Sequence, residues 1–587
     1  MSVTADPGPG FLALSSRPGA GDVPDVAAIA AAIGATGVDV ADAGGIRIAR
    51  WGLARGPIGD GFPVQLSLCP RRLDHDLTPE EVQQLLAGPD RQGLAQVLPP
   101  FAAATLVEGQ GLVAAVDRLG LRHLYTASGP YGAAVSTSAR ALALLEGPVL
   151  DREAVALQSR LGAQLRQRTL YRGVEKTSPG TLIRLRDGAI GVERYDPREP
   201  LTPVDPDLAA REAAAALRAF MSAYLDDHPG AVLQLTGGLD TRVLLAAVDE
   251  KRRRTLRAMT LTTPGSEDVR IAVALAQRYG MSHHLLDLQP MTEVTHDEAN
   301  TLCLNASAQV GGMADPLAFA AVSWAEARLE QRERLSGSSG EIGRGLYFWG
   351  RGPEQAVEPA LVRQLAAWRM FANQSVSAAA LHPDFAAWSG EFAADEIVDL
   401  FTAAAPTMFA AGDEVYLWQR NQRWSGVLES ASCLRRSTMS PMTDPRYLQI
   451  VTAVPPEVRR GSRFLARLVT ELDPELARIP MEGRPAPAVF ADPSLANRAR
   501  VLAMLGRKGF RKARQRLARR VKPPLGAQLF ATRFVEHLRE DAGCLDAVAG
   551  LDVFDPVWLK GLATGESEAT PADLALVVNL AQAFATT

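Results

Sequence analysis

The chain is 587 residues long and carries 62 Lys and Arg side chains against 66 Asp and Glu, a formal net charge of −4. This balance excludes a protein that binds nucleic acid through bulk positive charge, and a hydrophobic content of 47% excludes disorder over the whole chain. The length predicts about two to four domains. No apolar run approaches the roughly 18 to 20 residues of a membrane span, and the N-terminus lacks a signal-peptide pattern, so we expect a cytoplasmic protein without a transmembrane segment.

Short apolar segments bounded by Gly, Pro and Asp recur through the first 200 residues and predict strands. They alternate with Ala-rich stretches typical of helices, so we expect an α+β domain over residues 1–200. Four prolines within residues 197–206 then indicate a linker. The strands are expected at Phe11–Ser16, Ile46–Leu53, Phe62–Cys69, Gly111–Asp117 and Ala133–Ser138.

From Leu208 onward, helix-like and strand-like segments alternate. The strand-like segments include AVLQL, LRAMTL and HHLLDL, and the segments between them have helical apolar spacing. This alternation predicts a parallel sheet with right-handed crossovers and a ligand site at the carboxyl ends of its strands. We place this second domain over residues 206–497.

Basic side chains dominate the stretch from Arg498 to Lys522, which has eleven Lys and Arg in 25 residues and no acid. Its apolar positions recur at near-helical spacing, so it predicts a basic amphipathic helix within a helical C-terminal extension over residues 498–587. Such a helix either lies solvated on the domain or docks an acidic peptide, a partner protein or a membrane surface.

The cysteines do not form a recognisable set. They are far apart, show no CxxC spacing and are accompanied by no HExxH pattern, so we expect neither a zinc site nor a disulfide framework. We expect reduced, buried thiols at Cys69, Cys303, Cys433 and Cys544.

The most informative stretch is Ala231–Val248, AVLQLTGGLDTRVLLAAV, an apolar strand followed by a two-glycine turn and a helix. Backbone N–H groups and a helix N-terminus can converge on an anion there, with the Thr236 and Thr241 hydroxyls as further donors. Asp240 inside a phosphate site makes physical sense mainly as a Mg²⁺ ligand. The spacing is not that of a Walker A loop. The alternative is a tight turn with a side-chain cap and no ligand.

Further motifs connect this turn with a known family. LTGGLDT resembles the SGGxDS pyrophosphate loop of the N-type ATP-pyrophosphatases. Six other segments, in the same order, resemble motifs of the class B asparagine synthetase, β-lactam synthetase and lasso-peptide cyclase family, from about residue 100 to about residue 485. These segments are Asp117–Tyr125, Arg168–Gly180, Met259–Leu286, Ser336–Tyr347, Ser440–Arg459 and Arg463–Arg467.

The resemblance implies an α/β fold in two parts. Residues 1–200 would form an Ntn-hydrolase-like α+β sandwich, a degenerate glutamine amidotransferase-like domain. Residues 206–497 would form an adenine-nucleotide α-hydrolase-like (HUP) parallel-sheet synthetase domain with a mostly helical C-terminal part. Family members activate a carboxylate with ATP as an acyl-adenylate, release pyrophosphate and form an amide with an amine.

The resemblance also implies site residues and the cofactors ATP and Mg²⁺. Asp240 and Glu341 would be the metal carboxylates, with Glu341 standing where the family has Asp, and with Arg463 they would be the catalytic residues. A carboxylate with a longer side chain keeps the charge and the hard oxygen ligands. ATP would be bound by Leu235, Thr236, Gly237, Gly238, Asp240, Thr241, Leu261, Ser336 and Gly337.

Three positions depart from the family pattern. Ser2 stands where glutamine-using members carry the nucleophilic cysteine, so we do not expect glutaminase activity. Arg463 replaces a lysine that stabilises the adenylated intermediate, and a guanidinium cannot act as an acid at neutral pH. Ser338 replaces the Glu or Tyr that serves as the base for the amine. Candidates for a substitute base are Tyr347, Glu414 and Tyr416.

The leading interpretation is therefore an ATP-dependent amide synthetase of the lasso-peptide or β-lactam cyclase type. Its substrate would be a small molecule or peptide with a carboxylate and an amine, and a precursor peptide or partner protein could bind the basic C-terminal helix. The first alternative is an asparagine-synthetase-like ligase that uses ammonia or a small amine. The second is an inactive ATP-binding scaffold, for which Arg463 and Ser338 speak.

Overall fold

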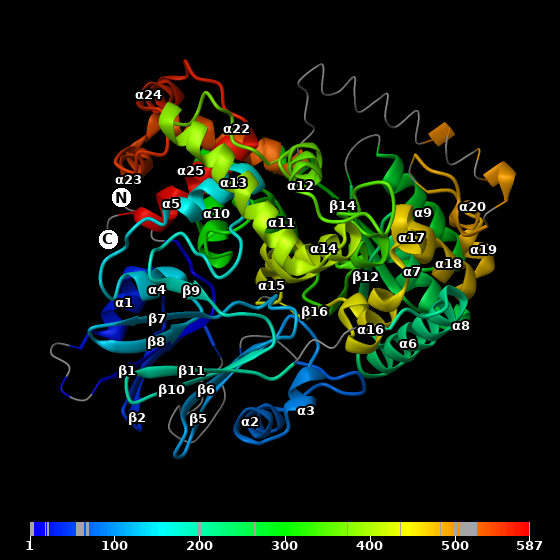
Figure 1. The fold of residues 1–587 in the computed structure, drawn as a ribbon, viewed down its shortest axis with the longest axis horizontal. Helices are drawn as coiled ribbons and strands as arrows, with labels where there is room; N and C mark the ends of the chain where they lie inside the picture. Colours follow the sequence, from blue (N-terminus) through cyan, green and yellow to red (C-terminus); the bar gives the residue numbers. More distant parts are fainter. Residues whose placement is uncertain are drawn as a thin grey trace.

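The computed structural model describes residues 5–585 except 18, 20–22, 54–63, 66–69, 197–201, 263–265, 373, 435, 482, 493, 498, 500–502 and 505–524. Two antiparallel sheets occupy the N-terminal part, and one parallel sheet lies among helices in the remainder (Figure 1). A mixed α/β fold is therefore confirmed. Within the described residues, no helix is both long and apolar enough to cross a membrane.

The first antiparallel sheet has six strands. Their order is β2 (Asp39–Ala43), β3 (Ile46–Trp51), β1 (Gly10–Ser16), β8 (Gly132–Ser136), β7 (Tyr125–Gly129) and β9 (Val174–Lys176). Because side chains alternate along a strand, β1 contributes to two cores. Its Leu12 and Leu14 face helices, whereas Phe11 and Ala13 face the second sheet.

The second antiparallel sheet has five strands and stacks on the first. Their order is β11 (Ala189–Arg194), β10 (Thr181–Arg186), β6 (Gly111–Val116), β5 (Ala102–Val107) and β4 (Val64–Gln65). One face of β6 joins the core between the sheets through Leu112 and Ala114, and its other face packs through Val113 on an outer helical layer. The helices of the two outer layers are α2 (Pro79–Ala87) and α3 (Arg91–Ala95) on this sheet, and α1 (Val26–Ala32), α4 (Ala139–Ala143) and α5 (Arg152–Leu161) on the first.

The parallel sheet has the strand order β14 (Ser282–Asp287), β13 (Arg257–Thr262), β12 (Val232–Gln234), β15 (Arg334–Leu335) and β16 (Thr438–Met439). All four neighbouring pairs are parallel. The chain builds outward from β12 first to one side and then to the other, so the carboxyl ends of β12 and β15 flank a topological switch point, where open α/β sheets bind ligands. Helices that accompany this sheet are α6 (Pro206–Asp227), α7 (Leu239–Ala247), α8 (Glu250–Arg253), α9 (Glu267–Tyr279) and α18 (Arg463–Leu472).

Most of the remaining chain is helical. The last helices return to the N-terminal sandwich, where the Tyr171 hydroxyl donates to the Ala583 carbonyl at 3.2 Å. The helices of the remaining chain that are named below or follow in sequence are α10 (His296–Gln309), α11 (Pro316–Glu326), the 3-10 helix η3 (Gly340–Arg344), α12 (Pro359–Leu365), α13 (Pro383–Ala404), α14 (Met408–Val415), η6 (Asn421–Arg423), α15 (Ser425–Ser432), α16 (Pro445–Ala453), α17 (Pro456–Arg459), α19 (Pro474–Ala477), α20 (Pro487–Ala491), α22 (Leu525–Glu540), α23 (Asp546–Ala549), α24 (Pro556–Thr564) and α25 (Pro571–Phe584).

Most of the predicted strands are found. Those expected at Phe11, Ile46, Gly111 and Ala133 correspond to β1, β3, β6 and β8, and the alternation after Leu208 corresponds to α6 through β14. Of the strand predicted at Phe62–Cys69, only Val64–Gln65 is described. Most of the basic stretch Arg498–Lys522, and residues 197–201 of the predicted linker, lie outside the described residues. The boundaries at residues 200 and 498 stay predictions, although α22–α25 share one apolar core with the first sheet and α10.

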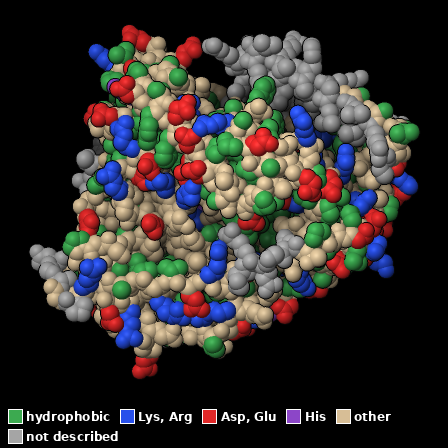
Figure 2. Space-filling view, in the orientation of Figure 1, with side chains coloured by type: hydrophobic (Ala, Val, Ile, Leu, Met, Phe, Trp, Pro, Cys, Tyr) green, Lys and Arg blue, Asp and Glu red, His purple; other side chains and the backbone are tan. Residues whose placement is uncertain are grey.

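Buried polar contacts join the sandwich to the helical half. Arg423 of η6 is fully buried and donates to the Arg166 carbonyl and, at 2.7 Å, to the Arg168 carbonyl. The neighbouring Gln422 carbonyl lies 2.9 Å from Nε2 of His123. On the face shown in Figure 2, acidic and basic side chains are interspersed over both halves.

We predict that Arg423→Leu destabilises the protein by about 2–4 kcal/mol, because it leaves buried carbonyls without donors. The midpoint of urea unfolding measures this change. Arg363→Leu is the matched control, since its guanidinium is 43% exposed and pairs with surface acids, which contributes at most about 1 kcal/mol. Equal, small effects of both substitutions would contradict a structural role for the Arg423 contacts.

Candidate functional site

Two loops meet at the switch point of the parallel sheet. One follows β12 and contains Gly237 and Gly238, and the other follows β15 and contains Gly337 and Gly340. A Cβ on Gly337 would come within 3.0 Å of the Thr241 backbone nitrogen, and one on Gly340 within 2.5 Å of Oδ1 of Asp240. Glycine at these two positions therefore lets the loop after β15 pack directly on the first turn of α7.

Hydrogen bonds hold the glycine turn from two elements. The Thr236 N–H donates to Oγ1 of Thr241 at 3.2 Å, and the Gly238 N–H donates to Oγ1 of Thr236 at 3.1 Å. From the first turn of α9, Oδ1 of Asp268 accepts from the Gly237 N–H at 2.7 Å. Helix α7 begins directly after the turn without a side-chain cap, so its first N–H groups are available to an anion.

Asp240 and Glu341 share one counter-ion. Nη2 of Arg344 lies 2.7 Å from Oδ2 of Asp240 and 3.3 Å from Oε1 of Glu341. Each carboxylate keeps one buried oxygen, Oδ1 of Asp240 and Oε2 of Glu341, with no hydrogen-bond partner among the described residues. Burial raises the pKa of Asp240 to about 6, with Arg344 opposing the shift and Glu341 adding to it. The sequence did not indicate Arg344.

This donor set fits Mg²⁺ only in part. Mg²⁺ prefers carboxylate oxygens and usually takes one or two of them together with waters and phosphate oxygens. Asp240 and Glu341 supply two carboxylates with unpartnered oxygens, and no cluster of three or more metal-binding side chains occurs in the described part of the chain. The pair therefore suits a metal that arrives with phosphates, provided that Arg344 gives way.

The residues expected around adenosine lie at the same edge of the sheet. Leu235 follows β12 and is buried, and its backbone N–H donates to the Met259 carbonyl at 2.8 Å. Leu261 lies near the end of β13 and is partly exposed. Ser336 follows β15, and its hydroxyl lies 2.8 Å from that of Ser338. The predicted ATP-binding residues thus lie along the carboxyl ends of β12, β13 and β15. Leu261 on β13 is the most distant from the loop after β15, because β12 lies between the two strands.

Arg463 is not brought into this site. It begins α18, its side chain is exposed, and it forms no ion pair with Asp240 or Glu341. Helix α18 packs closely on η3, as shown by the 2.6 Å distance that a Cβ on Gly343 would have to the Leu465 side chain. The predicted role of Arg463 would need a different side-chain position.

Sequence reasoning missed Glu429. It lies on α15, is 7% exposed, and neither of its carboxylate oxygens has a hydrogen-bond partner among the described residues. Burial raises its pKa to about 8, the nearby Ser338 side chain opposes the shift and the Glu341 carboxylate adds to it. The only signal in the sequence is an acid between apolar and small residues in GVLESAS.

The substitute bases proposed from the sequence are less suited. The rings of Tyr347 and Tyr416 are buried and meet edge to face at 5.7 Å. Burial raises the pKa of both hydroxyls, so neither accepts a proton as a phenolate near neutral pH. Glu414 on α14 is only half-buried. Ser2 lies outside the described residues.

No family model matches the chain, and no curated protein matches it.

We predict that Glu429→Gln changes the pH dependence of stability. The folded state holds this proton between about pH 4.5 and 8, where the unfolded state releases it, so the free energy of unfolding falls as pH rises through this window. The free energy of unfolding of the variant lacks this pH dependence, and relative to that of the wild type it should rise by on the order of 2–4 kcal/mol toward pH 8. Urea unfolding at a series of pH values measures the difference.

The matched control is Glu471→Gln, which alters an exposed carboxylate on α18. Parallel pH profiles for the wild type and both variants would contradict the raised pKa of Glu429.

Proposed function

We propose that this protein is an ATP-dependent amide synthetase that forms AMP and pyrophosphate, with the asparagine-synthetase-like chemistry that the motifs suggest. One observation carries the proposal. The loops at the switch point hold Asp240 and Glu341 beside an uncapped helix N-terminus, and each carboxylate keeps a buried oxygen to which no described residue donates a hydrogen bond. Such an arrangement favours a ligand that combines a divalent cation with phosphates.

The fold is compatible with the two domain types of the proposal. Two stacked antiparallel sheets between helical layers agree with an Ntn-hydrolase-like, degenerate amidotransferase half over residues 1–200. A five-stranded parallel sheet with β12 at its centre agrees with a HUP-type synthetase domain over residues 206–497. Neither domain type is established by its architecture alone.

Within this proposal, each part of the site has a role. Asp240 and Glu341 would hold Mg²⁺, and the backbone and hydroxyls of the glycine turn would bind the pyrophosphate end of ATP. Bound Mg²⁺ neutralises charge on the leaving pyrophosphate. Adenosine would lie along the carboxyl ends of β12, β13 and β15, against Leu235, Leu261, Ser336 and Gly337.

Glu429 is the residue that we assign as proton acceptor for the attacking amine. Ser338 stands where relatives place this base, and Glu429 lies close enough to influence it and Glu341 electrostatically. A raised pKa near the working pH suits a general base. We propose an intramolecular amine, as in a lasso-peptide or β-lactam type cyclase, with ammonia or a small amine as the alternative.

One observation favours a second candidate, an ATP-binding scaffold without turnover. Arg344 pairs with both Asp240 and Glu341 and so places a positive charge where Mg²⁺ would bind. A permanent ion pair of this kind would exclude the metal and with it the formation of AMP and pyrophosphate.

Analysis of the nucleotide products separates the two candidates. AMP and pyrophosphate formed with one carboxylate substrate support the synthetase, ADP contradicts the adenylating mechanism, and ATP binding without any product supports the scaffold.

We predict that Asp240→Ala abolishes formation of AMP and pyrophosphate while the protein stays folded, because the substitution removes a metal ligand from the start of a helix. Chromatography of the nucleotides and circular dichroism measure the two properties. Glu471→Ala is the control with an exposed carboxylate, and it should keep full activity. Wild-type rates in Asp240→Ala would remove Asp240 from the site.

We further predict that Arg344→Gln lowers the Mg²⁺ concentration needed for half-maximal ATP binding by about fivefold, which corresponds to about 1 kcal/mol for a partly exposed ion pair. The variant removes the cation that competes for both carboxylates. Titration of Mg²⁺ in the presence of a fluorescent ATP analogue measures this, with the exposed Arg351→Gln as the control. An increased Mg²⁺ requirement would show that Arg344 assists ATP binding.

A further inference from the structure

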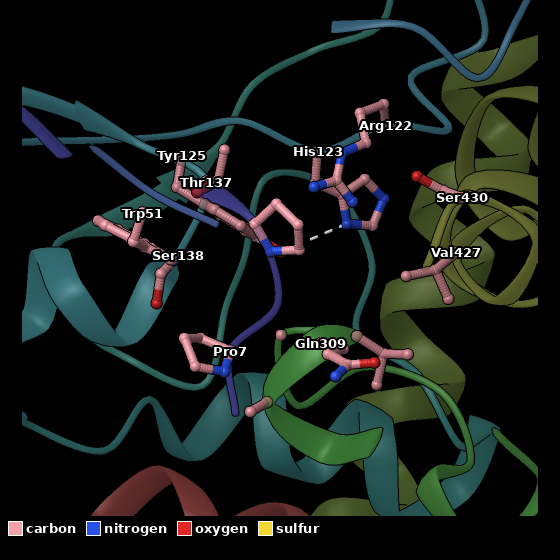
Figure 3. Close-up of a pocket in the computed structure, with 14 residues that line it drawn as sticks. Pro7, Trp51, Arg122, His123, Tyr125, Thr137, Ser138, Gln309, Val427 and Ser430 are labelled. Atoms are coloured by element: carbon pink, nitrogen blue, oxygen red, sulfur yellow. Dashed lines mark hydrogen bonds between the residues drawn. The ribbon is translucent and has the colours of Figure 1, made fainter. Parts of the chain in front are cut away.

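A small pocket lies between the two halves, away from the glycine turn. The sandwich contributes Trp51, Arg122 and His123 to its wall, and Gln309 and Ser430 come from α10 and α15 (Figure 3). Its volume of about 20 Å³ is enough for one or two groups the size of a water molecule.

Arg122 is the unusual residue in this pocket. It is only 7% exposed, and its guanidinium forms no hydrogen bond or ion pair with any described residue. Burial lowers its pKa to about 10, which leaves it charged at neutral pH. A buried cation without a partner is costly, by several kcal/mol after relaxation, so the site as described lacks a counter-charge.

The charged and titratable groups around Arg122 do not supply that counter-charge. Burial holds the pKa of His123 well below its usual value, so this ring is neutral, and burial raises the pKa values of Tyr125 and Cys433 to about 12. Arg423 adds positive potential at His123, whereas burial holds the pKa of Lys176 well below its usual value. These groups come from the sandwich, from η6 and from the end of α15.

The carboxylate of Asp117 is buried near Arg122, but its hydrogen-bond partners are backbone N–H groups. Asp117 accepts hydrogen bonds from four backbone N–H groups at 2.9 to 3.1 Å, including that of Arg122 itself. Its carboxylate closes the turn between β6 and β7 and makes no ion pair with the Arg122 guanidinium. The potential in the pocket is therefore positive.

Hydroxyl groups complete the wall. Oγ of Ser430 is buried without a hydrogen-bond partner in the described structure, and the side chain points from α15 toward His123 (Figure 3). Oγ of Ser138 accepts from the Ala141 N–H at 3.2 Å, which leaves its proton available. A guanidinium and a free hydroxyl from opposite halves thus face one small space.

We propose that this pocket is a binding site for one small monoanion, a halide or formate, held between Arg122 and Ser430. The anion supplies the missing counter-charge and bridges the sandwich to α15. The site is separate from the proposed ATP chemistry, and its test uses the full-length protein without nucleotide, so either proposal can fail alone.

The test compares thermal unfolding of the wild type in bromide or formate with that in gluconate at equal ionic strength. We expect the unfolding midpoint to rise saturably with the binding anion, whereas gluconate is too large for the pocket. The stronger of the two responses identifies the anion class, and in bromide-soaked crystals an anomalous peak should lie between Arg122 and Ser430.

Two variants locate the effect. Arg122→Met should abolish the saturable response and should be more stable than the wild type in gluconate, because it removes a buried unpaired charge. Ser430→Ala should raise the half-saturating anion concentration by about tenfold, as expected for loss of a hydrogen bond to a charged group. The exposed Arg478→Met is the control and should respond like the wild type. An unchanged anion response in Arg122→Met, or no anion-specific response in the wild type, would overturn the proposal.

Discussion

The contact between the glycine turn after β12 and the loop after β15 determines which charged side chains meet in the candidate functional site. Because Gly337 and Gly340 lack side chains, the second loop reaches the first turn of α7, and Asp240 and Glu341 come to share one guanidinium. Two carboxylates held so close repel each other in a medium of low dielectric constant. The pair therefore requires a cation, and Arg344 supplies one.

Helix α15 separates two regions of opposite potential. Glu429 belongs to the acidic side with Asp240 and Glu341, whereas the adjacent Ser430 faces the pocket that contains Arg122. Cys433, one turn further, is close enough to both Glu429 and Arg122 for each to influence it electrostatically. Buried charge is costly in either region, so occupancy of each site by an ion of the opposite sign would stabilise the junction of the two halves.

Features that depend on residues close together in the sequence can be predicted from it, whereas contacts between residues far apart in the sequence cannot. The strand, turn and helix around Thr236 follow from local residue types, and so do β1, β6 and the parallel sheet. The partners of the turn do not, because Arg344 reaches Asp240 across 104 residues and Glu429 approaches Ser338 across 91. Arg122 is still less predictable, since its peculiarity is that no described residue pairs with its guanidinium, and no local pattern encodes this.

The two arginines of the proposed synthetase site can be compared on geometry. In the proposal, Arg463 takes the role of a lysine that stabilises the adenylated intermediate, but its side chain is exposed at the start of α18. Arg344 already lies against both carboxylates. It is therefore the cation that Mg²⁺ would have to displace from these carboxylates. Of the two arginines, Arg344 is therefore the one whose position controls whether a divalent cation can reach Asp240 and Glu341, whereas Arg463 would need a different side-chain position to reach them.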